Sequence, residues 1–138
     1  MNISFRFDTY HVSELNYQVK EIEVQGEEQE ESVEVKNQFK VGIKKDFKEA
    51  FVEMDTDVST KIKEEEFRML TIRARFYFDV NAEFDQDTQS NKEKAKLIMD
   101  KLKIHGPLIC ETHMKEIIKN LTSSGYITPI MIENDLRF

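Results

Sequence analysis

Cysteine, glycine and proline are scarce in this sequence, and each shortage excludes a class of protein. Cys110 is the only cysteine, which excludes an internal disulfide and any metal site built from several cysteines. Four glycines are too few for a dinucleotide-binding loop, and with only two prolines they favour long regular elements over a loop-rich fold. The sequence therefore predicts long strands and helices and no cofactor.

Long apolar runs and an excess of positive charge are also missing. No stretch approaches the ~20 apolar residues needed to cross a bilayer, and Met1–Ser4 has neither the basic nor the apolar segment of a signal peptide. Twenty basic against 27 acidic side chains give a net charge of −7, the wrong sign for holding phosphate backbones. We expect a cytoplasmic protein that inserts into no membrane and binds no nucleic acid.

The chain does have enough apolar sequence for one core. Its 138 residues are typical of a single domain, and 39% hydrophobic residues with 34% charged ones suit a soluble folded protein. No internal repeat or linker divides it. We therefore expect one domain over residues 1–138.

Two long stretches alternate apolar and polar residues with period two, which is typical of strands with one buried face. They are Ala50–Ile62 and Phe67–Phe84, and Lys63–Glu66 between them suits a hairpin loop. The polar face of the first stretch carries carboxylates and that of the second carries arginines, so ion pairs between them should help to set the register. The charged residues are Glu53, Asp55, Asp57, Arg73 and Arg75.

Shorter alternating stretches come before these two. Phe39–Ile43 predicts a third strand of an antiparallel meander, followed by the polar connection Lys44–Glu49. At the N-terminus Ile3–Phe7 alternates as well, and Tyr10–Val24 continues as extended chain. The acidic run Gly26–Glu31 is typical of a solvated loop, with a contact to a basic partner as the alternative.

The C-terminal third changes to helical spacing. Ser90, with Glu93 three residues on, forms a capping box before an apolar stripe. Gly106-Pro107 predicts the end of this helix, with the proline in the first turn of a second helix that ends at Gly125. We therefore expect a two-layer α+β fold, an antiparallel meander of about four strands with two C-terminal helices packed on one face.

Catalytic patterns are absent from the sequence. His11, His105 and His113 lie on different predicted elements, and the carboxylates lie on polar strand faces or in the acidic loop, where nothing tunes their pKa for general acid catalysis. Cys110 and His113 are close enough on one helix face for a thiolate–imidazole pair, but no third group orients them and the segment is predicted to be buried. We therefore expect that the protein is not an enzyme and binds no metal ion.

The order of these elements resembles the SecB family of export chaperones and their small relatives. The family's first strand has an acidic residue before an apolar-x-aromatic triplet, which here reads Glu14-Leu15-Asn16-Tyr17. Its main helix carries a proline, an apolar pair and a segment like Ala-Arg-Glu-x-Ile, and the chain then continues through a glycine, an aromatic residue, a proline, alternating apolar residues and a closing Asn-Phe. The similar segments here are Pro107-Leu108-Ile109, Met114–Ile118, Gly125–Ile132 and Leu136-Arg137-Phe138.

The sequence departs from the SecB pattern at two places. The family's Leu-Phe-Pro segment at the start of the main helix is here Cys110-Glu111-Thr112. The sequence stops at Phe138, before the last helix and the basic, metal-binding tail with which the family engages the export motor ATPase. Binding to a motor is therefore in doubt, and small SecB-like proteins of unknown role or the chaperones attached to toxin–antitoxin systems fit equally well.

The resemblance implies ATP-independent binding of unfolded or partner polypeptide in apolar surface grooves. The apolar residues that flank the acidic crossover and the predicted connection between the helices are expected to line such a groove, with ordinary core as the alternative for each. These polypeptide-binding residues are Val24, Val33, Val35, Phe39, Leu102, Ile104 and Leu108.

The resemblance also implies a homo-oligomer, a dimer or a dimer of dimers. More apolar residues are present than two short helices can cover, which is typical of an interface. The expected interface residues are Phe5, Phe7, Tyr10, Tyr17, His113 and Ile117. A second hypothesis is an oligomeric adaptor or structural protein with one dedicated partner, such as a toxin or antitoxin, or an acidic inhibitor that copies nucleic-acid charge.

Overall fold

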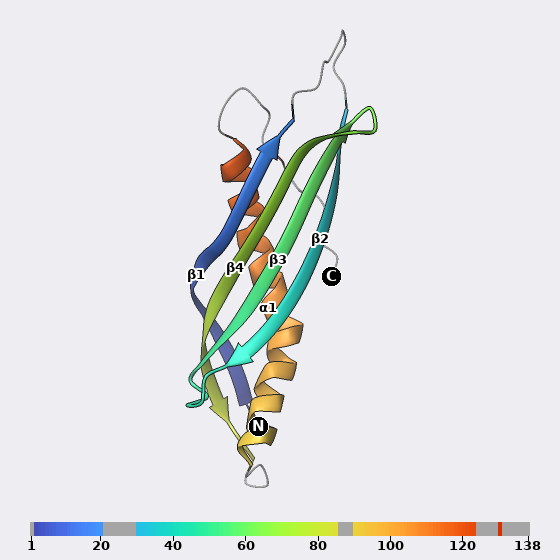
Figure 1. The fold of residues 1–138 in the computed structure, drawn as a ribbon. Coiled ribbons are helices and arrows are strands. Elements are labelled where there is room, and N and C mark those ends of the chain that lie inside the picture. The colour runs from blue at the N-terminus through green and yellow to red at the C-terminus, as the bar shows by residue number, and fades with distance from the viewer. Residues whose placement is uncertain (1, 21–29, 86–89, 124–129, 131–138) are drawn as a thin grey trace.

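The computed structural model describes residues 2–20, 30–85, 90–123 and 130. Its elements are β1 (Asn2–Val19), β2 (Glu31–Ile43), β3 (Glu49–Ile62), β4 (Glu65–Glu83) and α1 (Asn91–Thr122). The strands form one antiparallel sheet in the order β1-β4-β3-β2, and α1 crosses one face of it (Figure 1). This is the predicted two-layer α+β meander, with one helix in place of two.

Gly106-Pro107 lies inside α1 and does not end it, so the prediction of two helices was wrong. Gly106 is buried, and a Cβ placed there would lie 2.9 Å from the Val52 Cγ2 of β3. The glycine therefore allows the helix to approach the sheet closely. Pro107 removes one helical hydrogen bond, at a cost of about 3 kcal/mol. Burial of the helix on both sides of the pair, from Ile98 to Thr122, offsets that loss.

Strand β1 keeps its apolar side chains on the helix-covered face by means of two bulges. Its apolar residues are spaced by two positions, except after Phe7 and after Val12, where the spacing is three. The pairing with β4 shifts at both places, so Asp8 and Ser13 are the extra residues. Each bulge returns the next apolar residue to the same face of the sheet.

The outer face of the sheet carries the predicted ion pairs. Glu53 lies opposite Arg75 and Asp55 opposite Arg73, with N–O distances of 2.8 and 2.9 Å. The other face, against α1, holds the core. Its largest fully buried apolar side chains are Val52, Met54, Leu70, Ile72, Phe76, Phe78, Ile98, Leu102, Met114 and Ile118.

The turn between β3 and β4 is tighter than predicted. Ile62 pairs with Glu65, so the loop is Lys63 and Glu64 alone rather than Lys63–Glu66. Both loop residues have positive φ, 52° and 67°, as a type I′ hairpin turn requires. That backbone region is strained for residues with a Cβ and is best tolerated by Asn and Gly.

Replacing Lys63 by Asn and Glu64 by Gly should raise the free energy of unfolding by about 1–2 kcal/mol, because it relieves the strain at both positions. Urea unfolding followed by circular dichroism measures the change. Lys61→Asn, two residues earlier in β3 and also exposed, is the control and should give no gain. An equal or lower stability of the double variant would contradict the type I′ turn.

Candidate functional site

Helix α1 covers the two central strands more completely than the two edge strands. On β3 and β4, Val52, Met54 and Phe76 are 0% exposed. On the edges, Tyr10 and Val33 are 43% and 44% exposed although they lie on the same face. Two partly exposed apolar strips therefore flank the helix.

Each strip is defined by its residues. The β2 strip comprises Val33, Val35, Phe39, Val41 and Ile43. The β1 strip comprises Phe5, Phe7, Tyr10, Val12, Leu15, Tyr17 and Val19.

Strand β2 also has a free edge within the described residues. It is the last strand of the sheet and pairs with β3 through all of its 13 residues without a register shift. One row of its backbone N–H and C=O groups therefore faces away from the sheet (Figure 1). Such an edge can accept a further extended strand. Alternate side chains of that strand would lie beside the β2 strip, on the same face of the sheet.

A polar side chain, Asn37, interrupts the β2 strip at its middle. Its Oδ1 accepts a hydrogen bond of 2.7 Å from the Thr56 hydroxyl of β3. Its Nδ2 is buried and has no hydrogen-bond partner in the described part of the chain. An unpaired buried donor costs about 1–3 kcal/mol, so an acceptor brought to this point would bind favourably.

Three of the residues predicted to bind polypeptide lie together in the β2 strip. They are Val33, Val35 and Phe39, which share one face of β2, with Asn37 between the last two. They were predicted as residues that flank the acidic crossover, and a strand was predicted only over Phe39–Ile43, whereas β2 begins at Glu31. Val24 lies outside the described residues.

The three helical residues of that prediction do not join the β2 strip. Leu102 is 0% exposed and belongs to the core, the alternative that the sequence left open. Ile104 and Leu108 are 68% and 65% exposed, but a helix turns about 100° per residue, so both lie on the side opposite Gly106, away from the sheet. The connection between two helices that they were expected to form does not exist.

The predicted interface residues gather around the β1 strip. Phe5, Phe7, Tyr10 and Tyr17 all belong to it, and His113 of α1 stacks on the Phe7 ring at 4.3 Å between centroids. Ile117, also on the helix, is 9% exposed and packs in the core. Coverage of this strip by a second copy stays a prediction.

A buried ion pair between Arg68 and Glu31 holds the first residue of β2 against β4. Arg68 of β4 has a side chain that is 2% exposed, and its Nε donates to Glu31 Oε2 at 2.7 Å. The Arg68 backbone N–H donates to the Thr60 hydroxyl at 3.0 Å, which ties in β3 as well. Glu31 was predicted to lie in a solvated acidic loop, and that was wrong, because it enters the sheet and pairs with a buried cation.

Glu31 also has a shifted pKa. Burial by itself raises the pKa of its carboxyl group, but hydrogen bonds from Arg68 and Thr60 and the Arg68 charge together leave the pKa below the ordinary glutamate value. Glu31 is therefore ionised at neutral pH and holds the start of the β2 strip in place.

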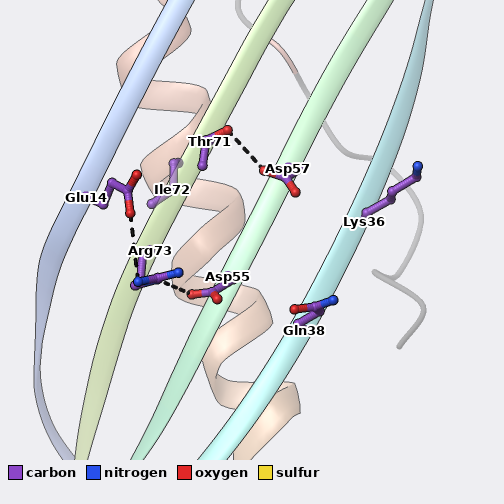
Figure 2. A pocket seen from close by; sticks show the side chains of 8 residues that line it. All are labelled: Glu14, Lys36, Gln38, Asp55, Asp57, Thr71, Ile72 and Arg73. Carbon is purple, nitrogen blue, oxygen red and sulfur yellow. Dashed lines mark hydrogen bonds and ion pairs between the residues drawn. The ribbon is translucent and has the colours of Figure 1, made fainter.

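The outer face of the sheet contains a polar hollow of about 330 Å³. Its side chains largely bind one another: Arg73 lies 2.9 Å from Asp55 and 3.9 Å from Glu14, and the Thr71 hydroxyl donates to Asp57 (Figure 2). The residues that line it are Glu14, Lys36, Gln38, Asp55, Asp57, Thr71, Ile72 and Arg73.

Glu53, next to this hollow on the outer face, is not tuned to act as a general acid. The hydrogen bond from Arg75 lowers the pKa of neighbouring Glu53, whereas a general acid needs a raised pKa.

The Cys110–His113 pair lacks an activated nucleophile. Burial raises the pKa of Cys110 to about 12, so the group is a neutral thiol at physiological pH. His113 stacks on Phe7 of β1. Among the residues that the structure describes, no three His, Cys, Asp or Glu side chains are grouped so as to hold a metal ion. No described helix is long and apolar enough to cross a membrane.

These features define a class of protein: a four-stranded antiparallel sheet crossed by one long helix, with partly exposed apolar strips on both edges and no metal-binding cluster in the described residues. Neither a protein-family model nor a curated protein matches the sequence. Among solved structures, the chain is similar to the SecB-like chaperone Rv1957 of Mycobacterium tuberculosis, with a TM-score of 0.71, 10% identity, and coverage of 96% of this chain and 91% of that one. The fold is therefore SecB-like, as the sequence predicted.

Rv1957 was solved in complex with a ChAD peptide from the Rv1956 HigA1 antitoxin. A protein of unknown function from Streptococcus agalactiae is 14% identical and covers 97% of this chain and 100% of that one, but its TM-score of 0.40 is too low to bear on the fold.

Proposed function

We propose that the protein binds an extended segment of unfolded or partner polypeptide along the β2 strip, without ATP and without catalysis. The observation that carries the proposal is the juxtaposition of a partly exposed apolar strip with a regular strand edge that is free within the described residues. The strip supplies contacts for apolar side chains, and the edge supplies hydrogen bonds for any backbone. The peptide complex of the similar chaperone Rv1957 supports the proposal.

The energies required are modest. Micromolar binding needs about −8 kcal/mol, and each large side chain that is fully buried contributes roughly 1.5–3 kcal/mol before the cost of ordering the segment. A few anchors in the β2 strip and some backbone hydrogen bonds therefore suffice. ATP is not needed, because a protein that binds the unfolded state acts by mass action.

The β1 strip is proposed to serve a different purpose, contact with a second copy in a cytoplasmic homo-oligomer. It lies at the opposite edge of the sheet and is wider, with Tyr10, Leu15 and Val19 each more than 40% exposed. A strip of this size on a small acidic protein is typical of an interface.

A second candidate function is that of an adaptor with one dedicated partner. The observation that favours it is the antitoxin peptide in the Rv1957 complex. Light scattering by an unrelated chemically unfolded protein, diluted with and without this protein, separates the two functions. Suppression at near-stoichiometric amounts without ATP supports general binding. No suppression by a folded sample overturns general binding and leaves the dedicated partner.

Val33→Asp should weaken the binding of an unfolded protein about tenfold or more, because it places a charge in the β2 strip. Val33 is already 44% exposed, so the fold should tolerate the change. Met69→Asp, at a 39% exposed apolar residue on the outer face of β4, is the matched control. Fluorescence anisotropy of a labelled unfolded protein measures both variants, and equal losses would contradict the assignment to β2.

A further inference from the structure

The order of residues in β2 is nearly symmetric about the middle of the strand. β2 runs from Glu31 to Ile43, so Asn37 is its central residue. Residues at equal distances before and after Asn37 match in character, apolar with apolar on the helix-covered face and acidic with basic on the exposed outer face. The matched residues are Val35 with Phe39, Val33 with Val41 and Glu34 with Lys40. Such a strand is complementary to an antiparallel copy of itself.

The backbone groups at the border of the sheet suit the same symmetric pairing. Directly after β2, the Lys44 N–H donates to the Glu49 carbonyl at 2.9 Å. Hydrogen-bonded and non-hydrogen-bonded pairs alternate along an antiparallel ladder, and β2 pairs with β3 without a shift. The even-numbered residues of β2 therefore bond to β3, whereas the odd-numbered ones, including Asn37, direct N–H and C=O away from it (Figure 1). Two antiparallel copies centred on Asn37 place these groups opposite each other.

The charges on the outer face favour this register over its neighbours. When both strands are centred on Asn37, each Lys40 lies opposite a Glu34 of the other copy, and each Lys36 lies opposite an uncharged Gln38. A shift of two residues in one direction places Lys36 opposite Lys40, and in the other direction opposite a second Lys36. Like charges directly opposite each other are destabilising. Two carboxylates of neighbouring β3 bind arginines of β4 rather than the lysines of β2.

We propose that two copies of the chain pair antiparallel along β2 about Asn37, so that their four-stranded sheets join into one. All 13 residues of the strand take part, over about 43 Å. The two Asn37 residues lie directly opposite each other, and each brings a side-chain carbonyl as an acceptor for the unpaired Nδ2 of the other. The β1 strip lies at the other edge of the sheet and takes no part.

This pairing also gives β2 a closed state. One strand edge cannot hold a second copy and another polypeptide at the same time, so polypeptide would bind only to separated copies. Dissociation of the dimer thus limits binding by mass action. This consequence rests on the proposed function of the β2 strip, whereas the dimer itself does not.

Charge reversal at the matched pair tests the dimer. Glu34→Lys and Lys40→Glu, made singly, each put like charges opposite each other twice, and each should raise the dissociation constant of the dimer about tenfold. The double variant restores opposite charges and should recover the original value. Lys61→Glu, an exposed charge reversal on β3, is the control and should change nothing. Sedimentation equilibrium measures association, and circular dichroism confirms the fold. Single variants that associate like the unaltered chain, or a double variant without recovery, would overturn the pairing.

A cysteine at the centre of the strand tests the register. In the proposed dimer, Asn37→Cys places two thiols opposite each other with about 5.5 Å between the Cα atoms, which a disulfide can bridge. Val33→Cys places its two thiols about 27 Å apart. After mild oxidation, a non-reducing gel should show a covalent dimer for the first variant only. The absence of that dimer, or equal amounts from both variants, would overturn the register.

The same cross-linked dimer separates this inference from the proposed function. Its probe is a short fluorescent peptide in which valine alternates with serine, followed by anisotropy. The oxidised Asn37→Cys dimer should bind the probe at least about tenfold more weakly than the same variant after reduction. Equal binding before and after reduction would overturn the closed state. A cross-linked dimer that forms, with no probe binding before or after reduction, would support the pairing and reject the proposed function.

Discussion

Replacing Glu31 by Ala should lower the free energy of unfolding by about 3–5 kcal/mol. The reason is the partner left behind: the Arg68 side chain is 2% exposed, so removal of the carboxylate leaves a buried guanidinium without its ion pair. Its Nε bond to Glu31 and a second guanidinium bond are both lost. Urea unfolding followed by circular dichroism measures the change.

Two further variants test whether the loss of stability comes from the unpaired buried charge or from the missing side chain itself. Glu34→Ala removes an exposed carboxylate from the outer face of the same strand and should change stability by less than about 0.5 kcal/mol. Glu31→Leu combined with Arg68→Met replaces the ion pair by apolar side chains and should recover most of the loss. Similar effects of Glu31→Ala and Glu34→Ala would contradict the buried pair.

The same pair determines a pH dependence. The pKa of Glu31 in the folded protein lies below its ordinary value, so its contribution to stability is fully present above the ordinary glutamate pKa. It is lost as the pH falls through the folded value. The stability difference between the unaltered chain and Glu31→Ala should therefore be constant at neutral pH and narrow only in acid. A difference that grew on acidification would contradict the assignment.

The strands could be predicted from the sequence because their signals are local. Period-two alternation predicted β3 and β4 to within two residues at each end. The opposite charges of Asp55 and Arg73 indicated a pairing that the register confirms. The Ser90–Glu93 cap is also local, and the Glu93 backbone N–H donates to the Ser90 hydroxyl at 3.0 Å.

The ion pair between Glu31 and Arg68 could not be predicted, because the two residues are 37 positions apart and nothing in the acidic run around Glu31 indicates a buried partner. The sequence likewise placed Leu102, Ile104 and Leu108 at a groove only because Gly106-Pro107 was interpreted as a break. In a continuous helix the same residues divide between the core and the far side. Tertiary packing thus decided the positions of Leu102, Ile104 and Leu108, and it also extended β2 back to Glu31, eight residues before the predicted start of that strand.

Gly106→Leu should lower the free energy of unfolding by about 3 kcal/mol, the second large effect. A Cβ added at this position would already lie 2.9 Å from Val52 Cγ2 and 3.2 Å from Leu102 Cδ1. Both neighbours are 0% exposed, and the β-branched Val52 has little freedom to move aside. Leucine is a better helix former than glycine by about 0.8 kcal/mol, so helix propensity alone predicts the opposite sign. Thermal and urea unfolding measure the change.

Pro107→Ala is the matched variant, because it tests the neighbouring half of the same dipeptide. It restores a backbone donor inside α1 and should raise the free energy of unfolding by about 2 kcal/mol. The two substitutions thus change the free energy of unfolding in opposite directions. Close contact with the sheet requires the glycine, whereas the proline weakens the helix and is only tolerated there. If the pair ended a helix instead, Gly106→Leu would be harmless and Pro107→Ala would bring no gain.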